Sequence, residues 1–302
     1  MGVFGGQMTR GGSLLDVSRR GFLRILSQLM AFIVALKLIP RISFARVVAP
    51  DNKPSFNPLP NIENPILRMQ QEVREALAKQ EDPPDWTMAI DVNRCIGCHA
   101  CTIACIAENQ LPSGMVYLPV LEQQSGHYPT LKQQFFPRPC MQCDNPPCVP
   151  VCPVDATYKR EDGIVPVDYD RCIGCRACIT ACPYGARTFD FGEWHTQGTP
   201  VSPQPYETAH SPEYNENRSR RNGNSTVGII RKCHFCIHRV EAGLLPACVT
   251  TCISGAITFG PGPNRNQDSL VSQKINQPTH RLKEQLGTEP RVFYVNADNL
   301  PS

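Results

Sequence analysis

The sixteen cysteines of this 302-residue chain constrain its fold more than any other feature, because they form four sets of four and none lies outside them. Every set opens with two cysteines separated by two residues and closes with two separated by three. Only the middle gap differs, at two, four, two and eleven residues. Sets one to four are, in chain order, Cys95, Cys98, Cys101, Cys105; Cys140, Cys143, Cys148, Cys152; Cys172, Cys175, Cys178, Cys182; and Cys233, Cys236, Cys248, Cys252.

Disulfide bonds and zinc are the first explanations to weigh for such a repeat. A disulfide within C-x2-C closes a very short loop and removes little entropy from the unfolded chain, whereas structural disulfides join distant segments. Zinc needs two C-x2-C pairs placed tetrahedrally around one ion, but sets one and three crowd four thiols into one turn and the start of a helix. Zinc also gives no reason for the prolines that follow Cys152 and Cys182.

Iron–sulfur clusters explain the spacing. The stretch CIGCRACITACP at 172–183 is C-x2-C-x2-C-x3-C-P, the run found in bacterial ferredoxins, in which three thiolates hold one cluster and the fourth ligates the other cluster of a pair. Set one has the same thiol spacing but Ile106 in place of the proline. We expect the fixed φ of Pro153 and Pro183 to suit the start of a helix after the last cysteine.

The repeat extends beyond the thiols. A five-residue pattern begins at the last cysteine of sets two, three and four: CPVDA at Cys152, CPYGA at Cys182 and CISGA at Cys252. We expect its fourth residue to turn the chain and its alanine to pack under a cluster. The β-branched runs 164–167 and 257–259 predict strands. Each unit is therefore predicted to run from a strand through a thiol loop and a short helix into a second strand.

The N-terminus has the pattern of an export signal. Arg19 and Arg20 precede an apolar run, 25–36, that suits a signal h-region and is too short to span a bilayer. The arginine pair predicts the twin-arginine route and a periplasmic destination. The small residues Ser43 and Ala45 offer a cleavage site. There are two alternatives: the signal is retained as a membrane anchor, or the segment is an amphipathic surface helix.

Charge and motifs exclude several functions. The net charge of +3 depends on residues 1–45; the remainder holds 24 basic and 26 acidic residues, a net of −2. No basic stripe with interleaved aromatics supports nucleic acid as a partner. The sequence also holds no P-loop, nucleotide fingerprint or recognisable catalytic triad, so it predicts no substrate chemistry of its own.

Three segments outside the thiol sets carry further predictions. Residues 64–80 predict a helix, capped by Asn64 with Pro65 in its first turn, whose apolar face packs on the core or on a partner. The stretch RVFYVN from Arg291 predicts a closing strand. Residues 193–227 are polar and lack periodicity, which predicts a docking surface or a mobile loop. Their local basic spot comprises Arg218, Arg220 and Arg221.

The chain resembles the four-cluster electron-transfer subunit of the molybdopterin oxidoreductases related to dimethyl sulfoxide reductase. The resemblance covers roughly 87–262 and is closest in motif to the periplasmic tetrathionate-reductase, polysulfide-reductase and dissimilatory sulfite-reductase membrane complex types. It rests on RCIGCHACTIAC at 94–105, CMQCDNPPCVPVCPVDA at 140–156, DRCIGCRACITACPYGAR at 170–187 and KCHFCIHRVEAGLLPACVTTC at 232–252.

The resemblance implies four [4Fe–4S] clusters, each with three ligands from one set and one from another. We name these centres A to D. Their implied ligands are Cys95, Cys98, Cys101 and Cys252 for A; Cys105, Cys233, Cys236 and Cys248 for B; Cys140, Cys143, Cys148 and Cys182 for C; and Cys152, Cys172, Cys175 and Cys178 for D.

The implied fold is α+β, with two pseudo-symmetric bacterial ferredoxin-like modules and loop insertions. The expected organisation is a twin-arginine signal peptide at 1–45, an N-terminal extension with one helix at 46–87, an outer module at 88–135 and 228–265, an inner module at 136–192, the polar insertion at 193–227 and a C-terminal tail at 266–302.

The implied function is electron transfer between a membrane quinone- or cytochrome-binding partner and a catalytic, molybdopterin-containing subunit in sulfur-compound or related anaerobic metabolism. Membrane association would come through the partner, and the chain would not be catalytic by itself. A free periplasmic polyferredoxin-like carrier is the alternative. A catalytic cluster would need an open iron site, and sixteen cysteines for four clusters leave none.

Five further residues stand beside the thiols. His99 and His234 lie inside thiol loops, where we expect them to tune hydrogen bonding and not to ligate. Arg94, Arg171 and Lys232 each precede a first cysteine. A cation there would raise a cluster's reduction potential; a solvated surface charge is the alternative.

Overall fold

A four-stranded sheet and two small strand pairs organise the part of the chain that the computed structural model describes, residues 64–79, 83–220 and 225–297. These residues belong to one compact unit, 58–302. The expected signal peptide at 1–45 lies outside them. Within the described ranges, no helix is long and apolar enough to cross a membrane.

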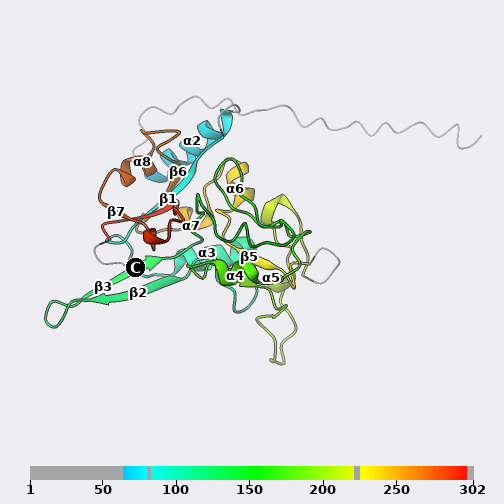
Figure 1. The fold of residues 1–302 in the computed structure, drawn as a ribbon. Helices are drawn as coiled ribbons and strands as arrows, with labels where there is room; N and C mark the ends of the chain where they lie inside the picture. The colour runs from blue at the N-terminus through cyan, green and yellow to red at the C-terminus, as the bar shows by residue number, and fades with distance from the viewer. Residues whose placement is uncertain (1–63, 80–82, 221–224, 298–302) are drawn as a thin grey trace, which may run out of the picture. The chain divides into compact units, whose positions relative to one another are not determined.

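The main sheet has the strand order β6-β1-β8-β7 (Figure 1). The central strand β1 (Trp86–Asp91) is buried along its whole length. It pairs antiparallel with β6 (Ile257–Pro261) and parallel with β8 (Val292–Val295), and β7 (Thr279–His280) closes the other edge. The strands predicted at 257–259 and in RVFYVN are therefore confirmed.

The predicted helix near 64–80 is confirmed as α2 (Pro65–Ala78). The side chain of Asn64 accepts a hydrogen bond from the Ile66 amide at 2.9 Å, which satisfies one of the free N–H groups of the first turn. Met69 and Val73 are buried in the core, so the apolar face packs on this protein itself. Helix α8 (Leu270–Ile275) also packs against β6 and β1 (Figure 1).

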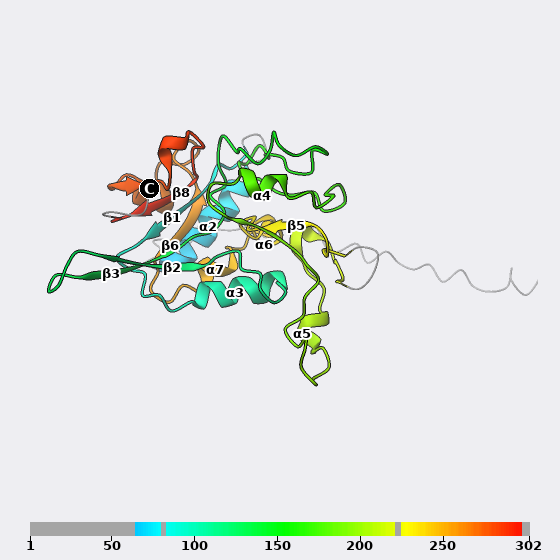
Figure 2. The same cartoon turned by 60° about the horizontal axis from the view of Figure 1, so that its bottom comes forward.

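The thiol sets occupy the loops and short helices outside this sheet. Helix α3 (Ala100–Asn109) carries the end of set one, and α4 (Ala177–Ala181) lies in set three. Strand β4 (Arg187–Phe189) follows set three, β5 (Ile230–Lys232; Figure 2) precedes set four, and the two strands pair with each other. The remaining elements are the hairpin β2 (Val120–Ser125) and β3 (Lys132–Pro137), α5 (Pro205–Thr208), η1 (Glu213–Asn215), α6 (Ile237–Glu241), α7 (Ala247–Thr250) and η2 (Glu284–Leu286).

The strand predicted at 164–167 is wrong. Val167 makes only an isolated bridge with Thr157. The backbone N–H groups that would pair with a neighbouring strand donate to side-chain oxygens instead. The Ile164 amide donates to Asp162, the Val165 amide to Gln142 and the Val167 amide to the Tyr214 hydroxyl. Pro166 has no N–H to donate. Side-chain acceptors have therefore replaced the neighbouring strand.

Pro153 and Pro183 do not start helices, so that expectation is also wrong. Each opens a turn instead. The residue two positions later has positive φ, 50° at Asp155 and 58° at Gly185, and Gly255 has 61°. The left-handed conformation breaks any helix there, and it confirms that the fourth residue of each repeat turns the chain.

Candidate iron–sulfur centres

The four cysteines expected in centre B line one cavity. Cys105 comes from α3, Cys233 and Cys236 from the loop after β5, and Cys248 from α7. All four are buried. Burial raises the pKa of Cys105, and the thiols of Cys236, Cys233 and Cys248 raise it further. Four cysteines from three segments therefore line one cavity.

The cysteines expected in centre C line a second cavity, whose walls include Tyr184 and Arg187. Burial, with the neighbouring thiols of Cys140 and Cys148, raises the pKa of Cys143 to about 12. Cys182, from set three, joins the three cysteines of set two in this wall. The structure thus brings the fourth cysteine of one set to the first three of another.

The thiols of centres A and D interact in the same crossed manner. Burial, with Cys252 and Cys95, raises the pKa of Cys101 to about 11. Burial also raises the pKa of Cys178; Arg187 opposes this, and the thiols of Cys172 and Cys152 add to it. Cys98 and Cys175 are exposed. The place of Cys175 in centre D is implied by the resemblance.

The thiol groups form a series. The thiol of Cys101 in centre A helps to raise the pKa of Cys248 in centre B. In the same way, the thiol of Cys140 in centre C helps to raise the pKa of Cys233 in centre B. Arg187 links centres C and D, because it acts on both Cys148 and Cys178. These interactions make A a neighbour of B, B of C, and C of D, and the two exposed cysteines belong to A and D.

The donor set fits iron–sulfur clusters. None of the sixteen cysteines forms a disulfide, and soft thiolates select iron–sulfur clusters, zinc or copper. Among the described residues, no three His, Cys, Asp or Glu side chains could hold a single metal ion. The thiols of centres B and C surround cavities instead.

Comparison of the sequence with known proteins identifies the family. Residues 94–156 match a 4Fe-4S dicluster domain, and residues 131–197 with 215–261 match another family of the same description. A selenate reductase subunit of Mesobacillus selenatarsenatis is 54% identical over 231 residues, 76% of this chain and 78% of the relative. The chain belongs to this family of reductase iron–sulfur subunits.

Two further relatives agree with that assignment. A putative dimethyl sulfoxide reductase iron-sulfur subunit of Halobacterium salinarum is 41% identical, covering 72% of this chain and 81% of the relative. A tetrathionate reductase subunit of Salmonella typhimurium is 41% identical, covering 71% and 73%. The resemblance deduced from the motifs is confirmed. The two dicluster domains and the sixteen cysteines fit four [4Fe–4S] clusters.

Two polar side chains that the sequence did not single out touch the thiols of this iron–sulfur subunit. Asn109 Nδ2 lies 3.5 Å from Cys105 Sγ and 3.9 Å from Cys236 Sγ. Arg187 donates from Nη2 to Cys148 Sγ at 3.0 Å. Hydrogen bonds to sulfur tune cluster potentials. The only sequence signal for Arg187 is its position directly after CPYGA.

The two histidines in the thiol loops differ. His99 is exposed, with φ of 58° just before α3. His234 is fully buried; its Nδ1 accepts from the Ile237 amide at 3.0 Å, and its Nε2 lies 3.2 Å from Glu213. Burial lowers the pKa of His234, although Glu213 opposes this. The neutral ring therefore uses Nε2–H to donate to Glu213, and both nitrogens are occupied.

The three cations that precede a first cysteine also differ. Arg94 and Arg171 are exposed, which agrees with the alternative that they are solvated surface charges. Lys232 is fully buried, so the surface-charge alternative is wrong for this residue.

The polar insertion contributes to the core, which the sequence did not predict. Glu213 is fully buried and accepts hydrogen bonds from Tyr117 at 2.7 Å and from Arg231 Nη2 at 2.5 Å. Burial alone would raise the pKa of Glu213, but Arg231 and His234 lower it to about 2, so the carboxylate is ionised. The second half of the insertion is therefore a structural part of the fold.

The expected basic spot does not form an exposed surface in its described part. Arg218 pairs with Asp170 at 2.9 Å, and Arg220 pairs with buried Asp190 at 2.7 Å. Both arginines are buried. Arg221 lies outside the described residues.

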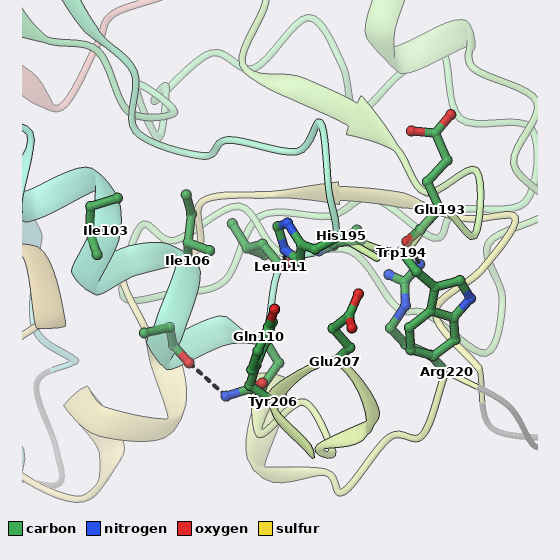
Figure 3. Close-up of a pocket in the computed structure, with 12 residues that line it drawn as sticks. Ile103, Ile106, Gln110, Leu111, Glu193, Trp194, His195, Tyr206, Glu207 and Arg220 are labelled. Carbon is green, nitrogen blue, oxygen red and sulfur yellow. Dashed lines mark hydrogen bonds between the residues drawn. The ribbon is translucent and has the colours of Figure 1, made fainter. Parts of the chain in front are cut away.

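The insertion also forms a pocket of about 380 Å³ with α3 (Figure 3). Ile103, Ile106 and Leu111 line one side, and His195 and Tyr206 come from the insertion. The pocket contains no cysteine, but α3 carries Cys101 and Cys105. The insertion thus lies against the helix that joins centres A and B.

Proposed function

We propose that the chain is an electron-transfer subunit whose four clusters carry electrons between a catalytic, molybdopterin-containing subunit and a membrane quinone- or cytochrome-binding partner. The observation that carries this proposal is that successive centres share segments: α3 carries Cys101 of A and Cys105 of B, Gln142 of set two donates to the Cys233 carbonyl of B at 2.8 Å, and α4 carries Cys178 of D directly before Cys182 of C. Centres A and D each include an exposed cysteine. A series with two accessible ends suits transfer between two partners. The relatives, named as reductase subunits for selenate, dimethyl sulfoxide and tetrathionate, favour respiration of oxidised sulfur or related compounds.

The ligand assignment in this proposal follows centres A to D, with all sixteen cysteines as ligands and no catalytic residue. When bound, each cluster accepts and releases one electron. The chain holds the clusters apart and excludes water from centres B and C, whose thiols are mostly buried. Asn109 and Arg187 orient and stabilise individual thiolates.

We infer that the sets form two pseudo-symmetric ferredoxin-like modules, with sets one and four in the outer module and sets two and three in the inner one. Matching positions have matching geometry. Gly97 and Gly174 have φ of 68° and 66°, and the residues before α3 and α4 have φ of 58° and 65°. The Ala156 amide donates to Cys152 Sγ at 3.2 Å, as Ala256 does to Cys252 Sγ.

Exposed apolar side chains mark the two ends of the series. Ile96 and Ile253, 59% and 73% exposed, each follow a cysteine of centre A. Ile173, 63% exposed, and Val151 adjoin cysteines of centre D. Exposed apolar residues beside a redox centre favour docking of a partner there, because the contact excludes water and brings the next centre close.

Placing a charge at either end should uncouple the chain from one partner. We expect Ile96→Glu and Ile173→Glu each to keep about sixteen iron and sixteen sulfide per chain. Each should reduce quinol-driven turnover of the complex at least tenfold, because a buried unpaired carboxylate opposes association. Iron and sulfide analysis, co-purification and quinol-dependent reductase assays measure these effects.

Leu67→Glu is the matched control, since Leu67 is 52% exposed on α2 and adjoins no cysteine. It should leave turnover unchanged. Full turnover and association in both end variants would favour the alternative, a free polyferredoxin-like carrier without a fixed catalytic partner. Iron near eight per chain in the unmodified protein would contradict the four-cluster assignment.

We also propose export to the periplasm by the twin-arginine route, with the signal either cleaved or retained as an anchor. Arg19→Lys with Arg20→Lys keeps the charge but removes the guanidinium pair. The cluster-loaded protein should then remain in the cytoplasm, which fractionation and immunoblotting would show. Normal periplasmic accumulation of the double variant would exclude this route.

A further inference from the structure

Two buried cations stand opposite each other on the β4–β5 pair. Arg187 and Lys232 are direct cross-strand partners, so their side chains lie on the same face of the sheet. Lys232 is fully buried, and Arg187 is 4% exposed. Like charges directly opposite each other are destabilising, and a buried charge is costly unless it is paired. A compensating negative charge must therefore lie nearby.

Within residues 64–79, 83–220 and 225–297, no carboxylate pairs with either cation. Lys232 Nζ donates to the Cys233 carbonyl at 2.7 Å and lies 3.5 Å from Gln142 Oε1. Arg187 donates to Thr157 Oγ1 at 3.1 Å and to Cys148 Sγ at 3.0 Å. Of these partners, only the sulfur can carry a negative charge.

Arg231, the neighbour of Lys232 on β5, shows the contrast. Successive side chains of a strand point to opposite faces. Arg231 is equally buried, but its face holds two carboxylates, Glu213 at 2.5 Å and Asp190 at 3.2 Å. One face of β5 thus has its own counter-ions, and the other face has thiols.

The thiols near the two cations belong to three centres. Against the effect of its burial, the pKa of Arg187 is raised by the thiols of Cys148 and Cys140 in centre C and of Cys178 in centre D. The charge of Lys232 opposes the rise in pKa of two thiols, Cys148 in centre C and Cys233 in centre B. A [4Fe–4S] cluster with four thiolates carries a charge of about −2, and reduction makes it more negative. Centre C therefore faces both cations, while B and D face one each.

We propose that Arg187 and Lys232 are an internal counter-ion pair that sets the reduction potentials of centres B, C and D, with the largest effect on centre C. The proposal rests on the ligand assignment made under the proposed function. Because each added electron is a negative charge, a nearby cation stabilises the reduced cluster and raises its potential. Centre A, whose cysteines form no hydrogen bond with either cation in the described part of the chain, should be insensitive.

The test is a redox titration of the cluster-loaded subunit followed by electron paramagnetic resonance. Arg187→Gln and Lys232→Gln should each make reduction of centre C at least tenfold less favourable, which for one electron is about 59 mV. Arg187→Gln should also lower the potential of centre D, and Lys232→Gln that of centre B. Arg187→Lys, which keeps the charge, should recover most of the shift in centre C.

Arg171→Gln is the matched control, because it removes the same charge from an exposed residue beside Cys172. An equal shift in this control, or unchanged potentials in both neutral variants with full iron content, would overturn the proposal. If the neutral variants lose iron, Arg187→Lys and Lys232→Arg must retain it; loss there too would show that shape and not charge is required. The titration uses the isolated subunit, so failure of the docking experiment would not affect it.

Discussion

Replacing Glu213 by alanine is expected to destabilise the cluster-loaded protein by about 3–5 kcal/mol, the cost of breaking a buried ion pair from one side. The carboxylate holds Arg231, Tyr117 and His234 together. Asp190 lies 3.2 Å from Arg231 but shares the same oxygen with Arg220, so it compensates the arginine only in part. A loss of this size should lower the midpoint of thermal unfolding by roughly 10 °C, which calorimetry at one fixed scan rate can measure.

Glu216→Ala is the matched control for this variant. Glu216 lies three residues along the chain and pairs with Arg218, but its side chain is 46% exposed. Arg218 keeps its other partner, Asp170, at 2.9 Å, and a pair with an exposed carboxylate contributes about 0–1 kcal/mol, so the midpoint should hardly move. A Glu213→Ala protein as stable as the control would mean that the insertion packs on the core without support from its buried charge.

The sequence predicted those parts of the fold that depend on local pattern. Helix α2 follows from the cap at Asn64 and an apolar face that includes Met69 and Val73. The turns at Asp155 and Gly255 follow from the repeat after each last cysteine. The crossed grouping of thiols followed from the spacing and from the family resemblance together, and the cavities of centres B and C bring together the expected cysteines.

Contacts between residues far apart in the sequence could not be predicted in this way. Glu213 in a polar loop has the sequence appearance of a solvated charge, yet its partner Tyr117 lies 96 positions away. The run 164–167 has β-branched residues but bonds to Gln142 and Tyr214 instead of a strand. Arg187 and Lys232 became recognisable only once β4 and β5 placed them opposite each other. In each case the deciding partner comes from a different segment.

The largest expected effect on the cofactors comes from Cys182→Ser. Cys182 follows α4 of set three, but it lies in the cavity of centre C with Cys140, Cys143 and Cys148. Loss of this thiolate should therefore convert or remove the cluster of centre C, while centre D keeps its signals. Iron content should fall by about one to four atoms per chain, depending on whether a three-iron cluster remains. Iron analysis and electron paramagnetic resonance of the oxidised protein distinguish these outcomes.

Cys152→Ser is the reciprocal control, because Cys152 belongs to set two but acts on Cys178 of centre D. The two variants should lose different clusters, and each should lose the cluster held mainly by the other set. This exchange cannot arise from a general loss of stability, which would affect both centres in both variants. If Cys182→Ser instead altered only centre D, each set would hold its own cluster. Arg187 would then bridge two separately ligated clusters, and the pairing of sets two and three would have to be revised.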